Sequence, residues 1–171
     1  MIIHLIRHAE AVERTPELPD EHRFLTRRGR KRFRRVASSL KKSGIKPDVM
    51  LTSPLIRAVQ TTEILAQAMK FKGDVVVTSL LAHGFQTEEL DKLMQGFPRA
   101  KEIVLVGHEP ELGAVASSLL AAKTSCSLQK GATVSFKRSI DTKEAVFRQL
   151  VDGNGEIINS RSKALKRLNN G

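Results

Sequence analysis

The sequence predicts an α/β protein, a three-layer α/β/α sandwich with a mostly parallel central sheet. Two observations lead to this prediction. Apolar runs of strand length alternate along the chain with segments in which apolar residues recur at helical spacing. The runs are also continuously apolar, which is typical of parallel strands that helices cover on both faces. The length of 171 residues suits one compact domain with one sizeable core.

The first half of the chain supplies two strand–helix units. Residues 1–7 predict a strand, and a polar loop follows to about residue 24. A helix is expected from its N-cap, Thr26, to about residue 42. The run VMLTS, 49–53, predicts a second buried strand. Ser53 as cap and Pro54 as first helical residue predict a second helix, to about residue 70.

The second half continues the alternation and then changes character. A third strand is expected at 74–81, a short helix capped by Thr87, a fourth strand at 102–107 and a helix from Pro110. Two segments, 132–138 and 145–151, then alternate in the strand manner around a turn. We expect a single domain over 1–158. A basic C-terminal tail, 159–171, is expected to be disordered apart from a possible short helix.

Composition narrows the classes of partner. The formal net charge is +11 at pH 7, so partners are expected to be anionic. The apolar start is too short for a signal peptide and no window is long enough to span a membrane, so a cytoplasmic location with no membrane partner is expected.

The single cysteine, Cys126, is expected to be a small buried filler. The stretch RRGRKRFRR, 27–35, should form a basic outer helix face with Phe33 inward.

Basic and imidazole side chains follow three of the predicted strands. Arg7 and His8 come after the first strand, Arg57 lies in the first turn after the second, and His108 follows the fourth. Ligands of open α/β sheets bind outside the carboxyl ends of the strands. We therefore expect these four side chains to meet at one edge of the sheet.

This set of side chains suits phosphoryl transfer. Arginine holds phosphate oxygens in a bidentate fork, and a neutral imidazole is a competent nucleophile. A second, protonated imidazole can stabilise the charge that builds on the phosphate oxygens. The reaction then needs no metal and no cofactor. A rival metal site built on His8 or His108 lacks the helical histidine spacing of zinc hydrolases, and no glycine-rich phosphate loop is present.

Four stretches resemble, in order and spacing, the motifs of the histidine phosphatase superfamily, most of all its short branch of SixA-like phosphohistidine phosphatases. The stretches are LIRHAEA, LTRRG, LTSPLIRAVQTTEIL and VLVGHEP, and the likeness covers about residues 1–125. It implies a phosphoglycerate mutase-like fold with His8 as the nucleophile that becomes phosphorylated. It also implies Arg7, Arg57 and His108 as the rest of a catalytic, phosphate-binding pocket.

The chain departs from the family pattern at three positions. Ala9 stands where glycine is common, and Arg14 where sugar-phosphate branches carry asparagine. Ala82 matches the place at which those branches carry an acidic proton donor. A missing acid favours phosphohistidine as substrate, because an imidazole leaves more easily than an alkoxide. Glu88 and Glu89 follow, and either a role as general acid or one in the first turn of a helix stays open.

Two functional hypotheses remain from the sequence. The first is a metal-independent phosphatase with a phosphohistidine intermediate, which most plausibly dephosphorylates phosphohistidine on a protein partner. Within that class the alternative is a phosphatase of small phosphate esters. The second is a non-catalytic module that binds RNA or polyphosphate through its basic helix. The complete Arg–His–Arg–His set favours the enzyme, and the absence of Trp and Tyr disfavours nucleic acid.

Overall fold

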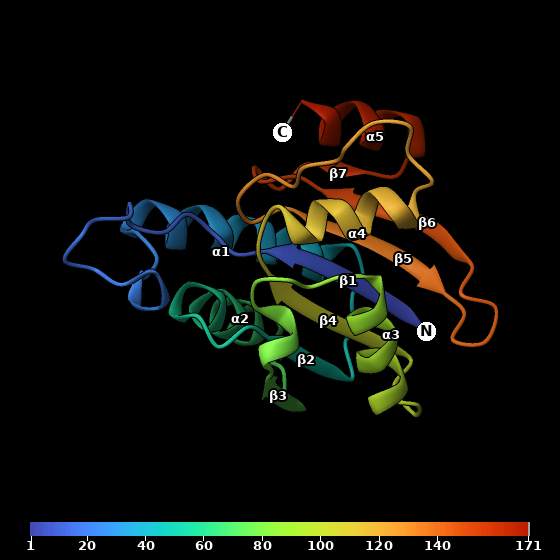
Figure 1. The fold of residues 1–171 in the computed structure, drawn as a ribbon, viewed down its shortest axis with the longest axis horizontal. Helices are drawn as coiled ribbons and strands as arrows, with labels where there is room; N and C mark the ends of the chain where they lie inside the picture. Colours follow the sequence, from blue (N-terminus) through green and yellow to red (C-terminus); the bar gives the residue numbers. More distant parts are fainter. Residues whose placement is uncertain (171) are drawn as a thin grey trace.

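The structure is a computed structural model that describes residues 1–170, and its centre is one mixed sheet (Figure 1). The strands are β1 (Ile2–Arg7), β2 (Val49–Thr52), β3 (Asp74–Val77), β4 (Glu102–Gly107), β5 (Thr133–Arg138), β6 (Ala145–Val151) and β7 (Ile157–Ile158). The α-helices are α1 (Arg27–Lys42), α2 (Ile56–Met69), α3 (Thr87–Gly96), α4 (Glu111–Leu119) and α5 (Arg161–Asn169). Two short 3₁₀ turns, η1 (Asp20–His22) and η2 (Ser79–Leu81), complete the described elements.

Within these residues the sheet order is β3-β2-β4-β1-β5-β6-β7. The first four strands of that order pair in parallel, whereas β5, β6 and β7 join antiparallel. The predicted α/β fold with helices on both faces is confirmed, with a sheet that is parallel in its first half only. The carboxyl ends of β1, β2 and β4 therefore lie at one edge of the sheet.

Two apolar cores lie on opposite faces of the sheet. Helices α1 and α2 cover one face, and α3, α4 and α5 cover the other (Figure 1). The α1 helix follows from its sequence, because its buried residues recur at helical spacing, among them Phe33, Val36 and Leu40. Its first turn is capped as predicted, with the backbone N–H of Gly29 donating to Thr26 Oγ1 at 2.8 Å.

Three predicted starts of helices are wrong by one or two residues. Helix α4 begins at Glu111, with Pro110 as its N-cap. Helix α2 begins at Ile56 with Leu55 as its N-cap, so Ser53 and Pro54 lie before it. Helix α3 begins at Thr87, but its cap is Gln86. The predicted third strand also divides, with β3 ending at Val77 and η2 following. Each shift leaves polar residues free for the loops at the sheet edge.

The C-terminal segment is more ordered than the sequence predicts. Ser160 caps α5, and Ala164 and Leu168 of that helix are buried in the same core as α4. Arg167 forms an ion pair with the buried Asp152. The expectation of a disordered tail is therefore wrong for residues 161–169, because two apolar positions at helical spacing suffice to anchor this short helix. The domain limit at residue 158 stays a prediction.

No helix within residues 1–170 is long and apolar enough to cross a lipid bilayer.

Candidate active site

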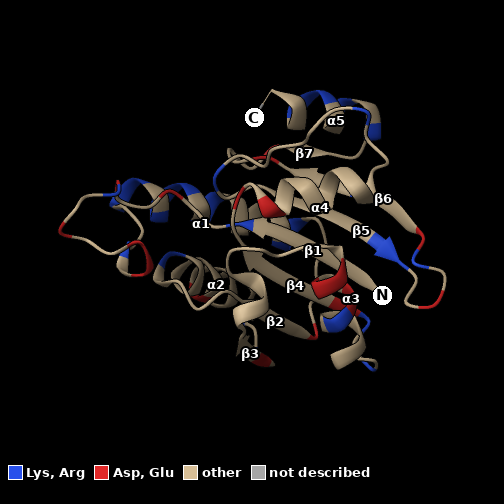
Figure 2. Ribbon diagram, in the orientation of Figure 1, with Lys and Arg blue, Asp and Glu red and all other residues tan. Residues whose placement is uncertain are grey.

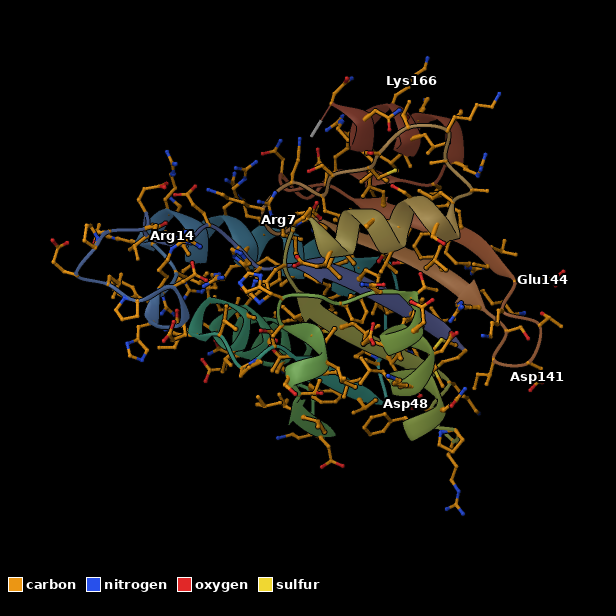
Figure 3. The ribbon with its side chains drawn as sticks, viewed as in Figure 1. Arg7, Arg14, Asp48, Asp141, Glu144 and Lys166 are labelled. Atoms are coloured by element: carbon orange, nitrogen blue, oxygen red, sulfur yellow. The ribbon has the colours of Figure 1, made fainter. Side chains whose placement is uncertain are left out.

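The four side chains that the sequence singles out come together at the carboxyl edge of the parallel strands. The rings of His8 and His108 have centroids 5.2 Å apart, and Arg57 Nε donates to His8 Nε2 at 3.3 Å. Arg7 precedes His8 at the tip of β1 and is labelled there in Figure 3. Three strand ends and the start of α2 therefore supply one pocket, as predicted.

The backbone holds the segment around His8 in place. The N–H of His8 donates to the carbonyl of Gly107 at 3.0 Å, which continues the pairing of β1 with β4. The N–H of Ala9 donates to the hydroxyl of Thr61 on α2 at 3.0 Å. Gly29 of α1 lies so close that a side chain on it would place a carbon 2.1 Å from the carbonyl oxygen of Glu10. This glycine allows α1 to pack directly against residues 9–11.

One ring nitrogen of His8 carries the proton of the neutral imidazole, and the other keeps its lone pair. His8 Nδ1 lies 2.7 Å from the carbonyl oxygen of Ala9, which can only accept, so Nδ1 carries the proton. The lone pair is therefore on Nε2, which faces Arg57. Burial lowers the pKa of His8 to about 3; the carbonyl contact with Ala9 opposes this shift, and the cations of Arg57 and Arg7 add to it. The imidazole of His8 is therefore neutral near pH 7, as a nitrogen nucleophile must be.

His108 is held at one nitrogen and open at the other. Its Nε2 lies 2.7 Å from the hydroxyl oxygen of Ser53. Its Nδ1 is buried and has no hydrogen-bond partner within residues 1–170. Burial lowers the pKa of His108 to about 3, with His8, Arg57 and His83 acting in the same direction. The second imidazole, expected to be protonated, is therefore neutral in this structure, because burial disfavours its charged form and the neighbouring Arg57 adds to that effect.

Asp20 holds the guanidinium of Arg57, and the sequence reasoning missed this. Arg57 is 3% exposed and donates through its two terminal nitrogens to the carbonyl and the carboxylate of Asp20, at 2.6 and 2.8 Å. Arg14 and Arg23 donate to the same carboxylate at 2.9 Å each. Although burial raises the pKa of Asp20, hydrogen bonds from these arginines hold it well below its usual range. The only sequence signal was one acid beside a basic stretch.

Arg7 is anchored from the other side of the pocket. One of its terminal nitrogens donates to the carbonyl of Leu128 at 2.6 Å, while its Nε is buried without a partner in the described chain. Glu109 lies nearby and accepts from the N–H of Leu128 at 3.3 Å. Burial raises the pKa of Glu109. One terminal nitrogen of Arg7 thus has a fixed contact, and its Nε can bind a further acceptor.

Glu89 has a structural role, whereas His83, which the sequence reasoning left as a loop residue, lies at the site. Glu89 completes a capping box by accepting from the N–H of Gln86 at 3.1 Å. Glu88 is exposed and lines a groove of about 480 Å³ between the start of α3 and α4. His83 has its ring centroid 5.5 Å from that of His108. Sequence periodicity could not place it, because it follows the turn η2.

The pocket is suited to an anion. It combines two guanidinium groups with two imidazoles, and no group of three metal-ligating side chains occurs among residues 1–170. Its unpartnered donors suit the oxygens of a phosphoryl group. With the imidazole of His8 pointing its lone pair inward, fold and site define a class, that of phosphatase hydrolases.

Comparisons with known proteins agree with this class. Residues 3–82 match the histidine phosphatase superfamily (branch 1), a range that includes Arg7, His8 and Arg57. An uncharacterised protein of Picosynechococcus sp. is 37% identical over 126 residues, 72% of this chain and 76% of the relative. The chain belongs to the histidine phosphatase superfamily.

Two solved structures share the fold. The protein histidine phosphatase SixA in complex with tungstate superposes with a TM-score of 0.80 at 21% identity, over 90% of this chain and 97% of that one. A SixA protein from Agrobacterium tumefaciens, described as a putative phosphohistidine phosphatase, gives 0.74 at 20% identity, over 87% and 96%. The phosphoglycerate mutase-like fold predicted from the sequence is thereby confirmed.

Proposed function

We propose that this protein is a metal-independent phosphatase that removes the phosphoryl group from phosphohistidine on a protein partner, through a phosphohistidine intermediate on His8. The observation that carries the proposal is the tautomer of His8. Its Nδ1 is bonded to the carbonyl of Ala9 at 2.7 Å, so the lone pair of Nε2 faces the cationic pocket.

The reaction has two steps. His8 Nε2 attacks phosphorus in line with the leaving group, a P–N bond forms, and the bond to the substrate nitrogen breaks. Water then attacks phosphorus, the bond to His8 breaks, and inorganic phosphate leaves. Arg7 and Arg57 bind the phosphate oxygens in both steps. Asp20 positions Arg57 through the contacts at 2.6 and 2.8 Å.

His108 is the second imidazole of the pocket. Its unpartnered, buried Nδ1 is suited to contact a phosphate oxygen. A bound phosphoryl dianion places negative charge next to His108. That charge raises the pKa of His108 and so favours its imidazolium form. The proton on His108 therefore comes with substrate binding, and it stabilises the oxygens as negative charge builds up in the transition state.

The substrate proposal rests on the lack of a dedicated carboxylic acid at the site. Glu89 is committed to the cap of α3, which removes one candidate acid. An imidazole leaving group needs less assistance than an alkoxide. Phosphohistidine on the surface of a partner therefore fits this pocket better than a sugar phosphate does.

The basic face of α1 supports a protein partner that is acidic. Residues 22–47 contain no acidic residue, and Lys and Arg follow one another along the helix (Figure 2). Arg27, Arg30, Lys31 and Arg34 share one face by their spacing, and no ion pair of residues 1–170 includes them. Cations at a helix N-terminus and like charges four residues apart both destabilise the helix. The helix that carries this face packs through Gly29 against Glu10, two residues from His8, so the face can steer an anionic partner to the site.

The deciding experiment compares kcat/KM for a protein phosphohistidine with that for sugar phosphates and nucleotides, with and without EDTA. The proposal predicts that the phosphoprotein is preferred by about 100-fold or more and that EDTA changes nothing. A preference for the small esters would replace this substrate class with the alternative one. Activity that EDTA abolishes would contradict the metal-independent mechanism.

The docking face has a matched test. Lys31→Gln with Arg34→Gln removes two charges near the site, and Lys41→Gln with Lys42→Gln removes two at the far end of the same helix. We expect the first pair to lower kcat/KM for the phosphoprotein about tenfold and to leave kcat/KM for a small phosphoramidate unchanged. Equal effects of the two pairs would show that only net charge matters. Tight RNA or polyphosphate binding that survives loss of turnover would favour the non-catalytic module.

A further inference from the structure

A third histidine lies beside the phosphate pocket. His83 comes directly after the turn η2, and its ring centroid is 5.5 Å from that of His108, with the two rings inclined by 35°. His108 in turn lies 5.2 Å from His8. The side chain of His83 is 59% exposed, whereas His8 and His108 are buried. His83 is therefore the member of this group that lies at the mouth of the pocket.

Two carboxylates lie next to the ring of His83. Its Nδ1 is 3.5 Å from Glu111 Oε1 and its Nε2 is 3.6 Å from Asp20 Oδ2. Both distances are longer than a good hydrogen bond, so neither nitrogen is committed to a partner in this structure. The ring has carboxylates on both sides and can still turn toward a bound substrate.

The carboxylate of Glu111 is fixed while one of its oxygens is unused. Oε1 accepts from the N–H of Gly84 at 3.1 Å, directly after His83 in the chain. Oε2 is buried and has no hydrogen-bond partner in the described part of the chain. A buried carboxylate oxygen without a donor is costly, so the carboxylate retains capacity for a further donor, and His83 Nδ1 lies nearest its other oxygen, Oε1. Glu111 is thus built to orient His83.

The position of His83 matches the place from which a leaving group departs. The leaving atom lies opposite the attacking nitrogen in an in-line displacement. Because His8 attacks from the buried side, the leaving group departs toward solvent, past the mouth of the pocket. The groups that face His83 are Asp20, Arg57, His108 and Glu111.

We propose that His83 is the proton donor to the leaving group, and that Glu111 is its positioning residue. This inference rests on the proposed phosphatase function and deepens it. In the first step the imidazolium of His83 gives its proton to the departing nitrogen or oxygen as the bond to phosphorus breaks. In the second step the neutral ring takes a proton from the attacking water, the bond from phosphorus to His8 breaks, and His83 is again protonated.

The role of His83 also alters the range of substrates. A proton donor matters most for a leaving group whose conjugate acid is weak, and it matters little for one that leaves readily. A site with His83 in this role retains a measurable rate on esters, although the pocket lacks a carboxylic acid at Ala82 and phosphohistidine stays the preferred substrate. Turnover of esters then depends on His83 and turnover of phosphoramidates much less so.

The test is a leaving-group series with His83→Gln. Wild type and variant are compared on aryl phosphates of falling leaving-group acidity, one alkyl phosphate and one phosphoramidate. We expect the variant to lose about 100-fold in kcat/KM on the alkyl phosphate and to stay within a few-fold on the nitrophenyl ester and the phosphoramidate. The basic limb of the pH–rate profile should also disappear. His22→Gln, at another exposed histidine that ends the turn η1, is the matched control and should leave every rate unchanged.

Glu111→Gln tests the positioning role. In this variant the loss in kcat/KM should again grow as leaving-group acidity falls, but less steeply than in His83→Gln. The pH–rate profile should also shift, since the imidazole is then oriented by a neutral group. Equal losses on every substrate in His83→Gln, or no loss on any, would overturn the assignment to His83 while leaving the phosphatase proposal standing. A folded wild type that hydrolyses no member of the series would overturn both.

Discussion

His4 and His8 lie four residues apart, within β1 and just after it, and both are buried, yet their surroundings differ. His4 is bonded at both nitrogens, Nδ1 to the hydroxyl of Ser135 at 2.7 Å and Nε2 to Glu102 at 2.9 Å. His8 is bonded through Nδ1 to a backbone carbonyl, and its Nε2 faces the cation of Arg57. A histidine with two satisfied nitrogens is a structural crosslink between strands. One with a lone pair in a cationic pocket has the features that the proposed nucleophile requires.

The same contrast separates the two ends of the parallel strands. At the amino end, the buried His4 is paired with Glu102, although Nε of Arg138 there has no partner in the described chain. At the carboxyl end, polar atoms of both Arg7 and His108 are buried without partners in the described chain. Unpaired buried polar groups lower stability and can be kept where they serve binding. The two ends therefore differ in their histidines: His4 is bonded at both nitrogens, whereas His108 keeps one nitrogen unpartnered.

The largest expected effect separates the two histidines of β1. His8→Asn should lower kcat for any phosphate substrate by a factor on the order of 10⁴ or more, because the nucleophile is lost. His4→Asn should leave kcat within a few-fold and lower the free energy of unfolding by about 1–3 kcal/mol, because Ser135 and Glu102 lose a partner. Steady-state kinetics and urea denaturation measure both. A fully active His8→Asn would contradict the distinction between the two histidines.

The second prediction concerns His108. His108→Asn should lower kcat by a factor of about 10²–10³, since one of the groups that stabilise charge on the phosphate oxygens is lost. The matched change Ser53→Ala removes only the partner at 2.7 Å from Nε2 and should cost about tenfold. Single-turnover kinetics should locate both losses in the chemical step. If Ser53→Ala has the larger effect, the hydroxyl and not the imidazole acts on the phosphate.

A smaller effect is expected from loosening Arg57. Asp20→Asn removes the charge that holds the guanidinium, and we expect a loss of about 10- to 100-fold in kcat/KM. Asp141→Asn, in the loop between β5 and β6, changes the same charge far from the site and serves as control. Inorganic phosphate should also stabilise the variant less than the wild type, measured by thermal shift. Identical kinetics of the two variants would show that Arg57 needs no anchor.

The smallest expected effect is on the pH dependence of stability. The folded-state pKa of both His8 and His108 is lowered to about 3 by burial, from an ordinary value of 6.5. Below that ordinary value the unfolded chain binds protons that the folded chain refuses, so stability falls as pH falls. Each histidine should cost on the order of 2 kcal/mol between pH 6.5 and pH 5.

Urea denaturation at pH 7 and pH 5 measures this dependence. The wild type should lose stability on acidification, and a variant with both His8→Asn and His108→Asn should lose much less. The difference between the two proteins removes the opposite contribution of Glu109, whose raised pKa makes acidification favourable. Equal slopes would mean that the two imidazoles titrate alike in the folded and unfolded states.

The sequence was sufficient for the elements that periodicity and strand ends control. It predicted α1 with its cap Thr26, the strand β4 and the meeting of Arg57 with His8, because each depends on local pattern or on the edge of a parallel sheet. It did not predict Asp20 or His83. Both lie in irregular segments whose path depends on tertiary contacts, and no spacing in the sequence connects them to the pocket.

Two further differences have the same cause. Ser53 looked like a helix cap because its neighbours suit one, but its hydroxyl is bonded to His108 instead. The basic C-terminal segment looked disordered because charge dominates it, but Leu168 and Ala164 bury one side of α5. In each case a long-range contact outweighs a local preference.

The most direct test of the account is the chemical identity of the intermediate. The enzyme is mixed with a phosphoramidate, quenched within one turnover at alkaline pH, where phosphohistidine survives, and digested for mass spectrometry. We predict a phosphoryl group on His8, none on His108 or His83, and its disappearance at the rate of turnover. Turnover without any phosphorylated His8, or a phosphoryl group on another residue, would contradict the central claim that His8 is the nucleophile.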